Sequence, residues 1–181
     1  MPSSVPAVDY LLDTSVLSRL LDDSHAGHAA VRAWEATLAA ESRKLISVVA
    51  LAELRFGLAL AKAANRQAIL PRLEEIIRQA ERHSPLEITR ATAHEYAQLK
   101  AAFVENSLPK RLQQHPNKGW GNPEGWTDEF TGSALGLQEN DLWQCAQAIE
   151  RDLTFVCCDA RVEALATASG GRLVVLSLKL P

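Results

Sequence analysis

Residues 10–20 read YLLDTSVLSRL, and this stretch sets the start of the fold. The apolar run Val8–Leu12 has the length of a short buried strand, and Asp13 or Thr14 can cap a helix that begins near Ser15. In open α/β sheets, ligands bind beyond the carboxyl ends of the strands. The stretch therefore predicts an α/β protein with the Asp13 carboxylate at its ligand-binding edge.

The same alternation of strand and helix continues along the chain. We expect further strands at 45–49, 86–88, 153–158 and 172–178, and helices at 29–41, 50–64, 69–82, 89–105, 141–152 and 160–170. Such alternation favours right-handed crossovers and a parallel sheet with helices on both faces. We therefore predict one domain over 1–181, built as a three-layer α/β/α sandwich around a mostly parallel sheet.

Composition narrows the class of protein. With 47% hydrophobic and 23% charged residues, the chain falls in the globular range. A net charge of -3 argues against a broad basic surface, so a polyanionic substrate would need local compensation, for which a divalent metal ion is the obvious candidate. Three cysteines without CxxC spacing argue against a disulfide framework or a thiolate zinc site. No basic and apolar leader and no membrane-length apolar run is found, which predicts a cytoplasmic protein with no membrane partner.

Four acids fall at positions that a parallel sheet brings to one edge. Asp13 and Asp159 each follow a predicted strand, while Glu53 lies early in one helix and Asp141 opens another. Two carboxylates about 4 Å apart repel by about 4 kcal/mol at an effective dielectric constant of 20, unless a cation is bound between them. Oxygen donors without a Cys or His cluster match Mg²⁺ or Mn²⁺, and such a site suits phosphodiester hydrolysis.

Each acid also has an ordinary structural interpretation when it is taken alone. Asp13 and Asp141 can serve as helix caps, Glu53 as a solvated helix residue and Asp159 as a turn acid. His25 and His28 have the spacing of a possible site on one helix face, but no HExxH motif accompanies them, which favours surface histidines. The dinucleotide motif GxGxxG and the phosphate-binding loop GxxxxGK[ST] are both absent from the sequence.

Four segments, in this order along the chain, resemble the PIN-domain family and most closely the VapC-type toxins of bacterial toxin–antitoxin pairs: LLDTSVLSRL, SVVALAELRFG, ENDLWQCAQAIERD and LTFVCCDARVEAL. The resemblance covers nearly the whole chain, and DTSVL and AELRFG are its most specific pieces. It implies a small α/β/α sandwich and an Mg²⁺- or Mn²⁺-dependent endoribonuclease that cuts RNA by attack of water. It also implies a cognate antitoxin, whose C-terminal segment lies as a helix in a groove beside the acids, and a homodimer.

The resemblance also assigns roles to individual residues. It implies four metal ligands, which are Asp13, Glu53, Asp141 and Asp159. Thr14 and Ser15 match small polar residues that orient the acids. Arg55 matches a basic residue beside the second acid, where it could pair with a phosphate or a carboxylate, or be a plain surface arginine. Relatives often carry a second acid or Asn shortly after the fourth ligand, whereas here only Asp159 stands there, with Arg161 and Glu163 nearby.

Residues 106–139 depart from the family by their length, and their proline, glycine and asparagine content predicts an insertion or flap. The aromatic and basic residues of this segment include Trp120, Trp126, Lys110, Arg111 and Lys118. They could stack on and grip an RNA loop, or the tryptophans could pack on their own domain or on a second subunit. Glu124, Asp128 and Glu129 dilute the basic charge, which favours packing.

Two other functions compete with a toxin nuclease. Phosphatases of the haloacid-dehalogenase type also begin with a strand and an acid, but they need a second Asp two residues later, and Ser15 occupies that place. A catalytically silent PIN-like module that binds RNA or protein is the alternative from a different class. The acid quartet argues against it, because a silent fold has no need to keep repelling charges together.

Overall fold

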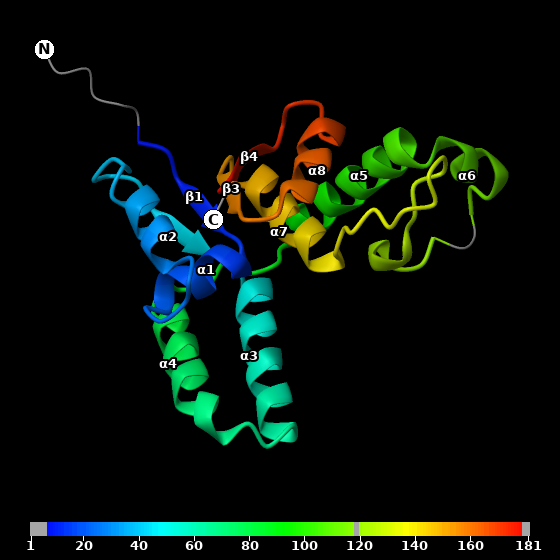
Figure 1. Cartoon of the computed structure of the whole chain (residues 1–181). Coiled ribbons are helices and arrows are strands. Elements are labelled where there is room, and N and C mark those ends of the chain that lie inside the picture. Colours follow the sequence, from blue (N-terminus) through cyan, green and yellow to red (C-terminus); the bar gives the residue numbers. More distant parts are fainter. Residues whose placement is uncertain (1–6, 118–119, 179–181) are drawn as a thin grey trace, which may run out of the picture.

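The computed structural model of the chain describes residues 7–117 and 120–178, so Lys118 lies outside the described residues (Figure 1). Its strands are β1 (Tyr10–Leu12), β2 (Lys44–Ile46), β3 (Thr154–Cys157) and β4 (Val174–Ser177). They form a parallel sheet in the order β2-β1-β3-β4. The predicted parallel α/β architecture is confirmed.

The helices follow the predicted alternation with shifted ends. The α-helices are α1 (Thr14–Leu21), α2 (His28–Glu35), α3 (Val48–Ala63), α4 (Leu70–Glu81), α5 (Arg90–Ser107), α6 (Pro109–Gln114), α7 (Glu139–Glu150) and α8 (Glu163–Ala168). Short 3-10 turns occur at η1 (Gln67–Ile69), η2 (Pro123–Gly125) and η3 (Ala160–Val162). Between α3 and α4 the chain makes a hairpin, and Figure 1 shows these two helices side by side as an arm that extends from the sheet.

Two elements differ from the sequence-based expectation. The segment 86–88 was predicted as a strand, but it contributes only a single parallel bridge between Leu86 and Ser47. Thr89 caps α5 directly afterwards, which leaves the segment no length in which to pair. Helix α2 ends at Glu35 instead of 41, because the backbone N–H of Thr37 bonds to the Trp34 carbonyl and its hydroxyl donates to the same oxygen, at 2.6 Å.

Alternating strand residues separate the helices into two layers. Leu11, Phe155 and Cys157 belong to a buried cluster that includes residues of α5, α7 and α8. The neighbouring residues Leu12 and Val156 pack instead with residues of α1 and α2. Because side chains point to opposite faces at every step along a strand, the sheet is covered on both sides. The three-layer α/β/α prediction is therefore confirmed.

Strand register sets where the functional edge lies. Leu12 pairs with Ile46 on one side and with Val156 on the other, so β1, β2 and β3 end nearly level. Asp13 follows β1 immediately, and its side chain accepts a hydrogen bond from the Ser15 N–H as the N-cap of α1. Ser47 caps α3 in the same way through the Val49 N–H. Polar groups after each strand thus collect at the carboxyl edge of the sheet.

The segment 106–139 folds against the main body. It contains α6, η2 and a bridge between Thr127 and Ala134. Trp126 is only 1% exposed, and its ring stacks on Phe103 of α5 with a centroid separation of 6.1 Å. Trp126 therefore packs within its own chain and is not exposed for stacking on RNA. Within the described ranges, no helix has the length and apolar character needed to cross a membrane.

Candidate active site

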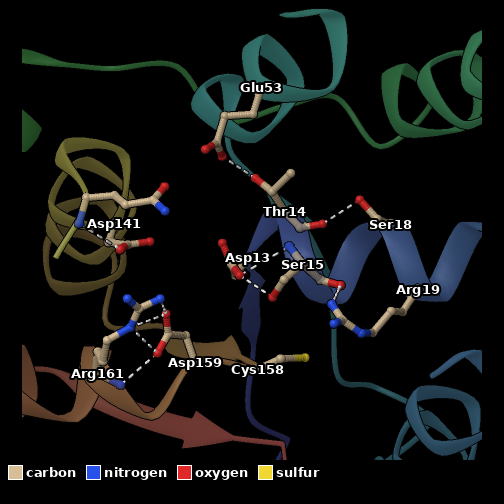
Figure 2. A pocket seen from close by; sticks show the side chains of 11 residues that line it. Asp13, Thr14, Ser15, Ser18, Arg19, Glu53, Asp141, Cys158, Asp159 and Arg161 are labelled. Atoms are coloured by element: carbon tan, nitrogen blue, oxygen red, sulfur yellow. Dashed lines mark hydrogen bonds and ion pairs between the residues drawn. The ribbon is translucent and has the colours of Figure 1, made fainter. Parts of the chain in front are cut away.

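A single pocket at the carboxyl edge of the sheet is lined by all four acids that the sequence pointed to, together with Thr14 and Ser15 (Figure 2). The remaining lining residues are Ser18, Arg19, Gln138, Cys158 and Arg161. Figure 2 shows Asp13 at the centre, between Glu53 from α3, Asp141 from α7 and Asp159 beyond β3. Four segments distant in sequence therefore contribute one carboxylate each.

The first turn of α1 fixes the central acid. Asp13 is only 9% exposed, and its Oδ2 atom accepts hydrogen bonds from both the backbone N–H, at 3.1 Å, and the hydroxyl of Ser15. Thr14 donates its hydroxyl to Glu53 Oε2. Ser15 and Thr14 thereby orient two different carboxylates, which is the role that their small polar side chains suggested. The Asp13 side chain is both a helix cap and a pocket acid.

Glu53 is held from two helices. Besides Thr14 of α1, Asn140 of α7 donates its Nδ2 to Glu53 Oε1 at 2.8 Å. Gln144, one turn further along α7 and fully buried, lies with its Nε2 atom 3.5 Å from Glu53 Oε2. These amides were missed by sequence reasoning, although Asn140 and Gln144 share a helix face through their i, i+4 spacing and Gln144 lies three residues after Asp141.

Asp141 has the most perturbed carboxyl group of the pocket. Burial and the neighbouring charges of Asp13, Glu53 and Asp159 raise its pKa to about 7, although a hydrogen bond from the Gln138 N–H opposes this shift. A carboxylic acid that is half protonated near neutral pH marks a place where negative charge is insufficiently compensated. A bound cation would relieve this repulsion.

Asp159 has the opposite environment. Its two carboxylate oxygens accept hydrogen bonds from Arg161 Nε at 2.9 and 2.8 Å, and the backbone N–H of Arg161 donates to Oδ1 at 2.9 Å. These contacts lower the pKa of Asp159 below its usual value. Asp159 is thus fully ionised and already carries a counter-charge.

Arg55 does not line this pocket. Its guanidinium forms an exposed ion pair with Glu81 of α4, with Nη2 2.6 Å from Oε1. The carboxylate that it pairs with is therefore outside the acid cluster. Two other arginines line the pocket instead, and one of them, Arg19, donates to the Ser15 carbonyl at 2.6 Å. Arg19 lies one helical turn after Ser15, and this spacing was a clue in the sequence that its side chain lies on the same side of the helix as Ser15.

The donor set fits a hard cation by its chemistry, because it consists of carboxylates with hydroxyl and amide groups in support. Burial raises the pKa of the Cys158 thiol, so this side chain is neutral in the metal-free pocket. Among the residues that the structure describes, no three His, Cys, Asp or Glu side chains form a ready-made group of metal ligands. Glu53 is turned to Thr14 and Asn140, and Asp159 to Arg161.

The fold and pocket thus define an α/β protein with a carboxylate-lined site at the carboxyl edge of a parallel sheet. The model of the PIN domain family matches residues 10–168, and the chain belongs to that family. PIN domains are nucleases, which in general use divalent metal ions.

Solved structures share this fold. The VapBC2 complex from Rickettsia felis, bound to a DNA fragment from its promoter, aligns with a TM-score of 0.58 at 15% identity, covering 94% of this chain and 98% of that chain. VapBC-5 from Mycobacterium tuberculosis, a member of a toxin–antitoxin family, gives 0.56 at 20% identity with the same coverage. FitAcB from Neisseria gonorrhoeae gives 0.54 at 23% identity, covering 93% and 96%. No curated protein sequence matches the chain.

Proposed function

We propose that the chain is an Mg²⁺- or Mn²⁺-dependent endoribonuclease toxin of a toxin–antitoxin pair, which hydrolyses RNA phosphodiester bonds. The observation that carries the proposal is the pocket itself, where four acids from separate segments of a PIN domain surround one space. Burying these carboxylates close together costs stability, as the pKa of Asp141 indicates, since it is raised first by burial and then by the neighbouring charges. A cation that is shared with a phosphate would offset this cost.

The metal ligands in this proposal come from Asp13, Glu53 and Asp141, with Asp159 as the fourth acid of the pocket. When bound, the ion supplies an acidified water and stabilises the negative charge that develops on the phosphate. The protein's own part is orientation. Ser15 holds Asp13, and Thr14 and Asn140 hold Glu53, so that these carboxylates are presented from fixed positions.

Cleavage of RNA tests the proposal directly. Purified protein should cut total cellular RNA in Mg²⁺ or Mn²⁺ and stop when EDTA is added. Asp13→Asn should lose cleavage, whereas Asp22→Asn should retain it. Asp22 is a matched control because it is 7% exposed, close to the 9% of Asp13, but lies outside the pocket and pairs with Arg72. Uncut RNA under conditions where the protein binds metal would contradict the assignment.

Metal binding separates the nuclease from a catalytically silent PIN-like module. Because a ligand that binds only the folded state raises Tm, Mn²⁺ should stabilise the wild-type protein and should stabilise Asp13→Asn far less. A Tm that does not respond to Mn²⁺ in either protein would favour the silent module that binds RNA or protein.

A cognate antitoxin is the protein partner that we propose, with a helix seated beside the acids. A shallow apolar groove adjoins the pocket, and its lining includes Val49, Ala52 and Phe56 of α3 together with Glu53, which both sites share. Phe56 is 65% exposed although it is a large apolar side chain. An apolar strip on a helix suits an amphipathic partner segment. The expectation is a small adjacent reading frame whose product co-purifies with the chain.

Three further features belong to the same proposal. The chain is a single domain over 1–181 with an insertion at 106–139, it forms a homodimer, and it acts in the cytoplasm. Size-exclusion chromatography with light scattering of the purified chain, with and without the antitoxin, would measure the assembly. A strictly monomeric toxin in both samples would contradict the dimer.

A further inference from the structure

Arg161 and Asp159 form the most complete ion pair of the pocket. Both oxygens of the Asp159 carboxylate accept hydrogen bonds from Arg161 Nε, Nη2 also donates to Oδ2, and the backbone N–H adds a further bond. Asp141, in contrast, accepts from the backbone N–H of Gln138 at 3.2 Å. Asp159 would have to give up strong, charge-assisted hydrogen bonds before its oxygens could ligate a metal ion.

Gly136, in the segment 106–139, lies against the Arg161 side chain. Gly136 has a φ of +69°, and a Cβ atom placed on it would lie 2.4 Å from Arg161 Nη1 and 2.6 Å from Cδ. The guanidinium therefore lies directly over the glycine backbone. Gly132 has the same φ of +69°, but a Cβ atom there would meet nothing within 4 Å. Only one of these two similar glycines makes room for Arg161.

The position of Arg161 suits contact with a phosphate. It lines the acid pocket, and its side chain is 57% exposed, so an incoming anion can reach the guanidinium. A planar guanidinium fork binds phosphate oxygens bidentately, and a carboxylate that holds one edge of the fork fixes its plane. The four carboxylates of the pocket repel an RNA backbone, and the exposed guanidinium of Arg161 offsets part of that repulsion.

We propose that Asp159 is not a metal ligand but a positioning residue that, with Gly136, holds Arg161 against a phosphate of the RNA substrate. This inference rests on the proposed nuclease function and departs from the ligand set that the family resemblance implies. The metal then belongs to Asp13, Glu53 and Asp141, and Arg161 becomes the group of this pocket that touches substrate.

The first arm of the test measures Mn²⁺ affinity by isothermal titration calorimetry. Asp141→Asn should weaken Mn²⁺ binding by at least about tenfold, whereas Asp159→Asn should stay within about twofold of the wild type. Equal losses in the two variants would show that Asp159 ligates the metal and would overturn the proposal.

The second arm measures the affinity for a fluorescein-labelled RNA of mixed sequence by fluorescence anisotropy, in an Asp13→Asn background so that the probe is not cut. Arg161→Gln should weaken binding about tenfold and reduce the slope of log affinity against log salt by about one unit. Adding Asp159→Asn to Arg161→Gln should cost nothing further, because the two residues act as one unit. Arg172→Gln, which removes an ion pair with Glu95, serves as the control.

Gly136→Ala provides a variant that leaves the Asp159 and Arg161 side chains chemically intact. It should displace the guanidinium and weaken RNA binding nearly as much as Arg161→Gln, without changing Mn²⁺ affinity. Gly132→Ala carries the same backbone cost and should leave RNA affinity within about twofold. Equal effects of the two glycine substitutions, or unchanged RNA affinity in Arg161→Gln, would overturn the proposal.

Failure of the proposed function has a different signature. A wild-type chain that binds no Mn²⁺ and cuts no RNA would contradict the nuclease. The Arg161 contact would then be decided by RNA affinity alone, through the comparison of Gly136→Ala with Gly132→Ala.

Discussion

Two aspartates of the same pocket, Asp141 at the start of α7 and Asp159 after β3, have pKa values displaced in opposite directions. Burial and three neighbouring acids raise the pKa of Asp141 to about 7, whereas the Arg161 guanidinium lowers that of Asp159. Residue type and position at the sheet edge are therefore insufficient to assign a role. Burial together with the neighbouring charges decides whether a carboxyl group is partly protonated, as in Asp141, or ionised beside a cation, as in Asp159.

The largest expected effect is a difference in the rate of RNA cleavage between variants of these two acids. Asp141→Asn should reduce the rate of RNA cleavage by about 10²–10³-fold, because it removes a proposed metal ligand. Asp159→Asn should reduce it by only about tenfold, through loss of the Arg161 orientation. Single-turnover cleavage with saturating Mn²⁺ measures both rates. Equal losses would contradict the different roles proposed for Asp141 and Asp159.

Residues 106–139 contact both sides of the pocket, Asp141 through the Gln138 N–H and Arg161 through Gly136, and Trp126 of this segment is buried against Phe103. Trp126→Ala should lower the free energy of unfolding by about 3–5 kcal/mol, because it leaves a large cavity beside Phe103. Phe130→Ala, at a side chain that is 76% exposed, should change it by less than about 0.5 kcal/mol. Chemical denaturation measures both values. A small loss for Trp126→Ala would show that the segment is not part of the packed body.

Protonation of Asp141 should make metal-free stability depend on pH. Its pKa in the folded protein, about 7, lies above the ordinary 3.8, so the folded state binds this proton more tightly than the unfolded state. The stabilisation is complete below pH 4 and is lost as the pH rises through 7. In EDTA, Tm of the wild type should fall by about 4–8 °C more than that of Asp141→Asn between pH 5 and 8. Parallel Tm profiles for the two proteins would contradict the raised pKa.

The smallest expected effect concerns Arg55, which does not line the pocket. Arg55→Ala removes an exposed ion pair with Glu81 and should change Tm by less than about 1 °C and RNA cleavage by less than about twofold. A large loss of RNA cleavage relative to the wild type would show that Arg55 contributes to the active site.

The sequence by itself determined the alternation of strands and helices, and with it the edge where Asp13 and Asp159 meet, because parallel strands direct their carboxyl ends to one side. It also pointed to Glu53 and Asp141 through their places near helix starts, and all four line the pocket. For Arg55, the helical period already argued against a place in the pocket. Arg55 follows Glu53 by two residues, so at about 100° per residue its side chain lies roughly 200° around the helix from that of Glu53.

Tertiary structure alone decided the surroundings of individual side chains. Trp126 became core rather than an exposed platform because α5 presents Phe103 to it. Arg161 faces the pocket because Asp159 binds its guanidinium and Gly136, from a distant segment, leaves space beneath it. The physical reason is that local patterns depend on backbone periodicity, which neighbours in sequence control, whereas the raised pKa of Asp141 and the contact of Gly136 with Arg161 depend on distances between segments that only folding brings together.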